Sequence, residues 1–272
     1  MTPFALGALV GLLLALTGAG GGILAVPLLV FALRLGVAQA APIGLLAVGV
    51  AAAMSAVLGL RDGIVRYRAA ALMGGLALAL APLGVAAAQR VPNAPLTFAF
   101  AAVLALSAWR MWQRARHASR ACEGADAAKD ALPCVIDARD GRLVWTRPCA
   151  QALALTGVTA GLLSGLLGLG GGFVIVPALT RFTELSARSV VATSLAVIAL
   201  ASIGGVGAAA WHGAIRWDIA GPFAVGSVVA SLLSRLVAAR VAGPRLQQGF
   251  AVVSAVVAVL LLARGMGWIA VR

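Results

Sequence analysis

Charged side chains are scarce in this sequence of 272 residues. Asp, Glu, Lys and Arg make up 11% of it, against about 25% in a typical soluble domain. Hydrophobic residues make up 62%, and the mean hydropathy is +1.04, so a soluble globular fold is excluded. The sequence also lacks a regular alternation of polar and apolar residues, which excludes a transmembrane β-barrel. These absences leave a membrane protein built of helices, because a helix in hydrocarbon satisfies its own backbone hydrogen bonds.

Acidic residues are the rarest charges, 8 against 21 basic residues, and the formal net charge is +13. In a soluble protein this excess would suggest nucleic acid as a partner. Here the basic residues lie between apolar runs, where membrane topology explains them more simply, and we expect no nucleic-acid partner. The N-terminus has neither a basic leader nor a small-residue cleavage site, so we expect its apolar segment to be retained.

Uncharged apolar runs are the candidates for segments that cross the bilayer, which takes roughly 20 apolar residues. They cover residues 1–33, 35–60, 69–89, 91–109, 148–180, 189–215, 219–234 and 246–263. The expected fold is therefore an all-α integral membrane protein with about eight hydrophobic helical segments.

A repeat runs through the whole sequence. A shift of 150 residues aligns 1–122 with 151–272 without a gap, and roughly a quarter of the positions are identical. Two homologous four-segment repeats are thus expected, at 1–113 and 151–272, separated by a linker loop at 114–150. The linker is rich in Arg and Asp, the positive-inside rule places it in the cytoplasm, and Asp140-Gly141 within 134–146 predicts a short β-hairpin.

The first segment of each repeat is too long for one straight crossing. A helix over residues 3–33 would be roughly 45 Å long, whereas the hydrocarbon core measures ~30 Å. Breaks are expected in the glycine cluster before Pro27 and again between Gly170 and Pro177, because Gly disfavours helix and Pro suits a helix's first turn. If the broken segments cross the membrane, the repeats are parallel and the basic residues divide roughly 14 to 7 towards the linker side. If they enter and return, the repeats are inverted and the division is roughly 16 to 5, and the sequence leaves both topologies open.

Broken helices at matching positions of two repeats indicate a transporter's substrate site. The first N–H groups of a restarted helix have no partner and carry partial positive charge, so such a site favours an anion. The predicted substrate-binding residues are Gly20, Gly21, Gly22, Pro27, Gly170, Gly171, Gly172, Pro177, Thr193 and Ser194, with Thr17 and Ser164 as further hydroxyls near the breaks.

The alternative role for these glycines is close helix packing. Gly18 and Gly22, Gly161 and Gly165, and Gly168 and Gly172 all have the small-xxx-small spacing of packed membrane helices. The proline at a fixed offset in both repeats favours a functional break over packing alone.

The glycine motifs and two further elements of the sequence resemble those of a known family. The doubled pattern GAGGGILAVPLL (18–29) and GLGGGFVIVPAL (168–179), together with TSL (193–195) and HGAIRW (212–217), is similar to the sulfite exporter TauE/SafE family, also called TSUP permeases. The resemblance implies a permease of the prokaryotic inner membrane, with about eight helices, that moves sulfite or related organosulfur or organic anions. The first repeat has Ile43-Gly44 where the second has Thr193-Ser194, so the hydroxyl pair occurs once.

Acidic residues are absent from the apolar runs. The repeat pairs Asp62 with His212, each at the mouth of a segment, and these are the candidate coupling residues if protons drive transport. Two solvated loop residues would look the same. Arg66 and Arg216 also recur, either to attract anions or to anchor the helices at the headgroups.

Cysteines number three, at positions 122, 134 and 149, all in the linker. Their spacing matches neither a redox pair nor a zinc site, so we expect reduced free thiols, no metal and no cofactor. The expected function is a secondary permease that exports a small anion and is not an enzyme. The alternatives are an anion channel or, on weaker grounds, an intramembrane hydrolase using Ser164 and His212. The expected partners are the anion, the lipid bilayer and, for coupling, protons, and a homo-oligomer is left open.

Overall fold

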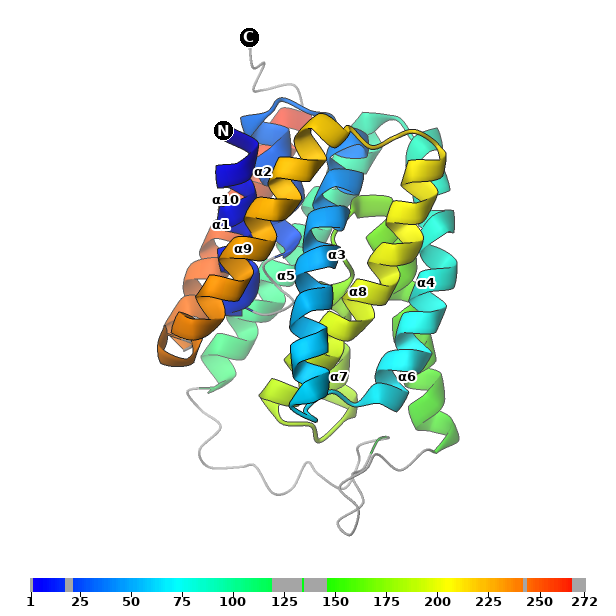
Figure 1. Cartoon of the computed structure of the whole chain (residues 1–272), viewed down its shortest axis with the longest axis vertical. Helices are drawn as coiled ribbons and strands as arrows, with labels where there is room; N and C mark the ends of the chain where they lie inside the picture. Colours follow the sequence, from blue (N-terminus) through cyan, green and yellow to red (C-terminus); the bar gives the residue numbers. More distant parts are fainter. Residues whose placement is uncertain (1, 18–21, 119–133, 135–145, 242–243, 266–272) are drawn as a thin grey trace.

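The computed structural model describes residues 2–17, 22–118, 134, 146–241 and 244–265, and within them the regular elements are all helical (Figure 1). This confirms the all-α class. The helices are α1 Thr2–Thr17, α2 Ala25–Ala32, α3 Val37–Arg61, α4 Tyr67–Arg90, α5 Asn93–Ala118, α6 Arg147–Leu167, α7 Gly172–Phe182, α8 Ala187–Trp211, α9 Trp217–Val241 and α10 Pro244–Gly265.

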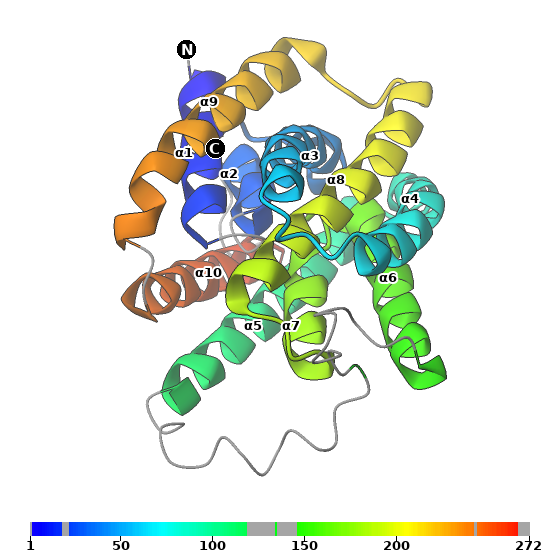
Figure 2. The same cartoon turned by 60° about the horizontal axis from the view of Figure 1, so that its bottom comes forward.

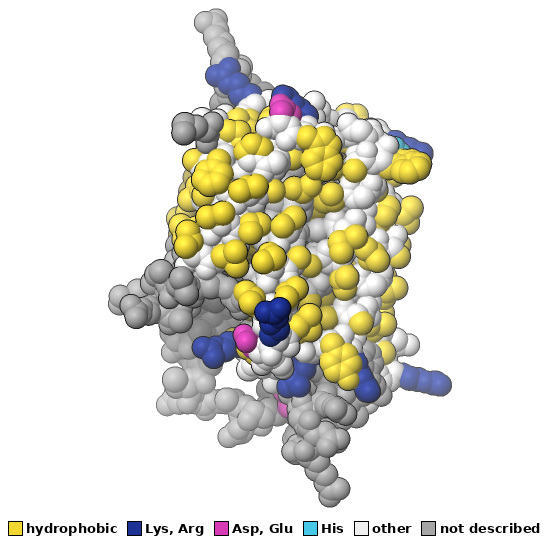
Figure 3. All heavy atoms as spheres, viewed as in Figure 1, with side chains coloured by type: hydrophobic (Ala, Val, Ile, Leu, Met, Phe, Trp, Pro, Cys, Tyr) yellow, Lys and Arg dark blue, Asp and Glu magenta, His cyan; other side chains and the backbone are white. Residues whose placement is uncertain are grey.

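Several helices have the dimensions of membrane spans. In the described part of the chain, α3, α4, α6, α8 and the first 18 residues of α9 are long and apolar enough to cross a bilayer, and shorter apolar stretches lie in α1, α5 and α10. Hydrophobic side chains cover the middle of the face seen in Figure 3, while charged side chains gather near its two ends. Among the large apolar side chains, Leu155, Ile203 and Leu233 are each more than 60% exposed. The molecule is therefore a multi-pass membrane protein with a lipid-facing flank.

The two ends of the molecule carry different loops. We call one of them the linker end, because α5 ends and α6 begins there. The α3–α4 loop (62–66) and the α7–α8 connection (183–186) lie at the same end (Figure 1). The opposite end carries the α2–α3 connection (33–36), the α4–α5 connection (91–92) and the α8–α9 loop (212–216). Contacts support both groupings, because Ser189 bonds to Ile64 at the linker end and Gly36 lies against Asn93 at the opposite end.

The central pair of helices consists of equivalent elements from the two halves. A shift of 150 residues maps α3 onto α8. The two pack side by side in opposite directions, since Gly49 lies against Ser202 and Gly59 against Ala192. Helices at matching positions in the sequence thus run in opposite senses.

Two outer helix pairs, α6 with α4 and α1 with α9, are equivalent to each other under the same shift of 150 residues. Helix α6 packs in parallel on α4, with Gly157 against the backbone of Met73. Helix α1 packs in parallel on α9, with Gly7 against the backbone of Phe223, which is the same contact shifted by 150 residues in each chain segment (Figure 2). The structure therefore has the inverted arrangement of the two that the sequence left open.

The broken segments enter the molecule and return to the end they came from. In the second half, a disulfide joins Cys134 to Cys149 at the start of α6, and the Cys134 N–H donates to the Phe182 carbonyl at the end of α7 over 3.2 Å. Both limbs of the α6–α7 hairpin therefore start and finish at the linker end. The α1–α2 hairpin starts and finishes at the opposite end, where α9 begins (Figures 1 and 2).

The prediction of free thiols is wrong for Cys134 and Cys149. They are joined by a disulfide with a Cα–Cα distance of 5.0 Å, and both residues are buried. A spacing of 15 residues does not reveal this bond, because it depends on Cys134 pairing with the end of α7 as an isolated β-bridge to Thr183. Cys122 and the predicted hairpin turn at Asp140-Gly141 lie outside the described residues.

Candidate functional site

The turn between α6 and α7 is built of glycines. Gly168 ends α6 with φ +71°, Gly170 has φ +67°, and Gly171 precedes α7 with φ +72°. These left-handed conformations cost a residue with a side chain about 1–2 kcal/mol. The turn is also crowded, since a β-carbon on Gly168 would overlap the Ala41 carbonyl oxygen of α3. The GLGGG sequence is thus explained by a sharp reversal of the chain inside the protein.

The equivalent turn of the first half is described from Gly22 onward, and Gly20 and Gly21 lie outside the described residues. A 3₁₀ turn at 22–24 leads into α2. Pro27 lies in the first turn of α2, where its missing N–H leaves no helical hydrogen bond unmade. Pro177 does not follow this prediction, because α7 already begins at Gly172 and the proline falls in its second turn.

The two turns meet beside the central helices. A β-carbon on Gly22 would lie 3.0 Å from a Val48 methyl and 3.6 Å from the Leu169 carbonyl oxygen. One on Gly170 would lie 3.3 Å from Val48 and 3.0 Å from Ile198 of α8. Residues about 150 positions apart in the sequence are thereby brought together around Val48.

The electrostatics of this meeting point follow from the direction of the two half-helices. Helix α2 runs from the turn to the opposite end, and α7 runs from its turn to the linker end (Figure 1). Both N-termini therefore lie in the interior, where their first N–H groups have no intrahelical acceptor and each dipole leaves partial positive charge. Partial positive charge from two helices favours an anion between them.

Buried polar side chains in the described part of the chain are all Ser or Thr. The Ser164 hydroxyl is fully buried one turn before Gly168 and makes no hydrogen bond with the described residues. The same holds for Ser202, which lies one turn beyond Ile198 on α8. Buried hydroxyls of this kind are rarely left without a partner. Sequence reasoning missed Ser202, whose equivalent in the first repeat is Ala52, so no repeated pattern marks it.

Thr193 and Ser194 already make hydrogen bonds within the protein. The Thr193 hydroxyl accepts from the Arg66 backbone N–H over 3.1 Å, and the Ser194 hydroxyl donates to the Val191 carbonyl over 2.8 Å. Ser189, which sequence reasoning also missed, donates its hydroxyl to the Ile64 carbonyl over 2.7 Å. These side chains lie near the start of α8, at the linker end, and two of them fasten the α3–α4 loop.

Asp62 and His212 occupy opposite ends of the molecule. Each is an exposed residue directly after the C-terminus of its helix, α3 or α8. Their basic neighbours differ. Arg216 forms an exposed ion pair with Asp218 at 3.0 Å, whereas the Nε of its repeat equivalent Arg66 is buried and has no hydrogen-bond partner among the residues described.

Close packing accounts for some glycines of the small-xxx-small pattern. A β-carbon on Gly161 would overlap Ala77, and one on Gly165 would overlap the Ala81 carbonyl, both on α4. The packing interpretation is therefore right for this face of α6. The glycines from 168 to 171 have the different task of forming the turn.

Known proteins resemble the chain along nearly its whole length. The sequence model of the family described as Sulfite exporter TauE/SafE matches residues 4–261. A probable membrane transporter protein of Xylella fastidiosa (strain Temecula1) is 28% identical over 265 residues, which is 95% of this chain and 93% of the relative. Its counterpart in strain 9a5c is 29% identical over 236 residues, 86% of this chain and 83% of the relative.

A shorter likeness extends to an archaeon. A probable membrane transporter protein of Methanocaldococcus jannaschii is 46% identical over 56 residues, 21% of each chain. No solved structure matches the chain. With its inverted helices and paired glycine turns, the chain is a membrane permease rather than an enzyme, and it belongs to the sulfite exporter TauE/SafE family.

Proposed function

We propose that this permease is a secondary carrier that exports a small oxyanion, sulfite or a related organosulfur anion, and that the anion binds where the two glycine turns meet. The observation that carries the proposal is the pair of opposed half-helices whose N-termini both lie in the interior. Gly22, Gly170, Gly171 and Gly172 offer backbone N–H groups there. The other residues of the proposed set are Gly20, Gly21, Pro27, Pro177, Thr193 and Ser194. Of these, Thr193 and Ser194 lie nearer the linker end and are hydrogen-bonded within the protein.

The chemistry of the interior supports a small oxyanion. The polar residues that are buried as a whole in the described part of the chain carry hydroxyls, which donate to oxygen atoms without adding charge. The Ser164 hydroxyl beside the α6–α7 turn, which has no partner among the described residues, would gain an acceptor when an oxyanion binds. The family description names sulfite, which has three such oxygens.

Packing at the meeting point favours a carrier over a channel. Gly22 and Gly170 both lie close against the Val48 side chain. At the linker end, two side-chain hydrogen bonds hold the 62–66 loop on α8. Passage of an anion requires these contacts to open, as in alternating access between inverted repeats.

Orientation in the membrane is proposed from charge. With the helices arranged as in the structure, basic residues divide roughly 16 to 5 in favour of the linker end, so we place that end in the cytoplasm of a prokaryotic cell and the membrane as the inner one. The Cys134–Cys149 disulfide points the other way, because disulfides persist in oxidising compartments. We give the charge distribution more weight, since it involves many residues whereas the disulfide involves one pair.

Flux into proteoliposomes tests the function. Sulfite, sulfate, thiosulfate, sulfoacetate and acetate are compared, each with and without a pH gradient. Saturable flux of a sulfur anion is expected, and sensitivity to the gradient would direct the next substitutions to Asp62 and His212. Flux that does not saturate would favour the channel, and no flux of any anion would contradict the proposal.

A reporter that fluoresces only in the cytoplasm tests the orientation. Fused after Gly265, at the opposite end where α10 finishes, it should stay dark, and inserted into the linker it should fluoresce. The reverse pattern would place the disulfide in the periplasm and overturn the proposed orientation.

A further inference from the structure

A small cavity lies at the opposite end of the molecule, between α3, α4 and the α8–α9 loop. Its volume is about 20 Å³, enough for one water molecule. It reaches from the exposed Gln89 and the half-buried Ala214 down to the buried Leu45 and Gly165. Ala41, which also lines it, is the residue whose carbonyl abuts Gly168 in the α6–α7 turn. The cavity thus lies between solvent and one of the two glycine turns.

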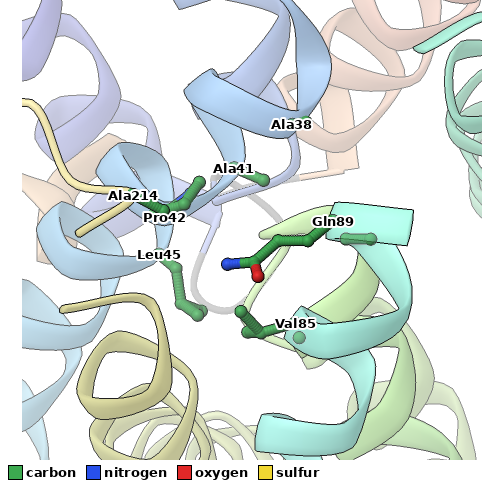
Figure 4. Close-up of a pocket in the computed structure, with 9 residues that line it drawn as sticks. Ala38, Ala41, Pro42, Leu45, Val85, Gln89 and Ala214 are labelled. Carbon is green, nitrogen blue, oxygen red and sulfur yellow. The ribbon is translucent and has the colours of Figure 1, made fainter. Parts of the chain in front are cut away.

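Gln89 is the polar side chain of this cavity. Figure 4 shows its amide extending from α4 towards Pro42 and Leu45 of α3. The other lining side chains are Ala, Pro, Leu and Val, with one Gly. An amide can donate hydrogen bonds to an oxyanion without holding it by charge.

At the linker end, two hydrogen bonds hold the 62–66 loop on α8. There the Ser189 hydroxyl binds the Ile64 carbonyl at 2.7 Å, and the Thr193 hydroxyl binds the Arg66 N–H at 3.1 Å. Shifted by 150 residues, these hydroxyls become Gln39 and Ile43, and the loop partner of Ser189 becomes Ala214, which lines the cavity. We refer to the Ser189 and Thr193 bonds to the 62–66 loop as the latch.

We propose that the cavity beside Gln89 is the mouth through which the anion passes at the end opposite the linker, and that Gln89 is the polar side chain the anion meets there. The inference rests on the proposed function and adds to it a passage and a specificity-determining residue. Because the cavity holds only one water, the mouth widens when an anion passes. At the linker end, the latch holds the 62–66 loop on α8 in this conformation.

Charge at position 89 provides the first test. In proteoliposomes with sulfite on the side of the opposite end, Gln89→Glu should raise KM roughly fivefold to tenfold, because a carboxylate beside the path repels an anion. Gln39→Glu is the matched control, since it adds the same charge to a residue at the same end that does not line the cavity. It should change KM less than about twofold. Equal effects of the two substitutions would overturn the role of Gln89.

Thiol accessibility provides a second test that needs no flux. In a chain whose three native cysteines are replaced by Ser, Leu45→Cys and its repeat equivalent Leu195→Cys are treated with a membrane-impermeant anionic thiol reagent from each side in turn. Leu45→Cys should react from the side of the opposite end, and Leu195→Cys should react at least tenfold more slowly from the linker side. If Leu45→Cys does not react, or reacts no faster than Leu195→Cys, the cavity is not a mouth for the anion. If the wild type carries no anion, the proposed function fails, while this labelling still decides whether the passage exists.

Discussion

Gly171 offers the sharpest test of the glycine turn. Its φ of +72° lies in the left-handed region, which costs a residue with a β-carbon about 1–2 kcal/mol. A β-carbon there would also lie 2.9 Å from the Ala160 carbonyl oxygen, so α6 or the turn must shift, and such overpacking adds about 1–3 kcal/mol. Gly171→Ala should therefore destabilise the protein by about 2–5 kcal/mol and displace the N-terminus of α7.

The assay pairs thermal unfolding in detergent with sulfite flux. Gly63→Ala is the matched control, because Gly63 has φ +67° in the α3–α4 loop but no described atom within 4 Å of the position that a β-carbon would take. It should lose only about 1–2 kcal/mol and keep its flux. Gly171→Ala should lose at least tenfold in kcat/KM, because the N–H groups that we propose bind the anion move.

The reasoning would be refuted by a folded Gly171→Ala protein that transports as well as Gly63→Ala. Such a result would mean that the N-terminus of α7 is not part of the anion site, and that the turn serves only to reverse the chain. If Gly171→Ala does not fold, flux is measured for Ser164→Ala instead. That substitution removes a buried hydroxyl that has no partner among the described residues, and it should lower affinity for sulfite severalfold while leaving the turn intact.

Two further predictions concern the linker end. Arg66→Gln should raise KM for the anion severalfold when the anion is supplied from that side, because the Arg66 Nε is buried and has no acceptor in the described part of the chain. Arg216→Gln should not raise KM, because the Arg216 side chain is exposed and ion-paired. Equal effects of the two substitutions would contradict a role for Arg66. Combining Ser189→Ala with Thr193→Val removes both latch bonds, each worth about 0.5–1.5 kcal/mol, and should speed hydrogen exchange of the 62–66 backbone roughly tenfold or more. Unchanged exchange would show that other contacts hold the loop.

The helical class and the chain breaks were predictable from the sequence because each depends on residues close together in the chain. The helical class follows from composition, and the break in each first segment follows from the excess length of an uncharged run that contains Gly and Pro. The family resemblance, read from the GLGGG motif and its partner, is confirmed over residues 4–261.

Other features depended on which distant residues come into contact. The Pro177 position was wrong because α7 begins five residues before it, and the cysteine prediction was wrong because Cys134 pairs with the end of α7. Ser189 and Ser202 carry no repeated signal, so their contacts with the α3–α4 loop and with Gly49 were not foreseen. The site residues themselves remain predictions.

The sequence by itself determined that this chain is a helical membrane protein with paired glycine breaks, because hydrocarbon requires the backbone to form helix and clustered glycines disfavour it. Only the tertiary structure decided that the broken segments return to the end from which they started. Charge counts of 14 to 7 and 16 to 5 differ by too few residues to choose. The contacts of α6 with α4 and of α1 with α9 do choose, because successive glycines along α6 and α1 meet successive residues along α4 and α9 in the same order, which makes each pair parallel.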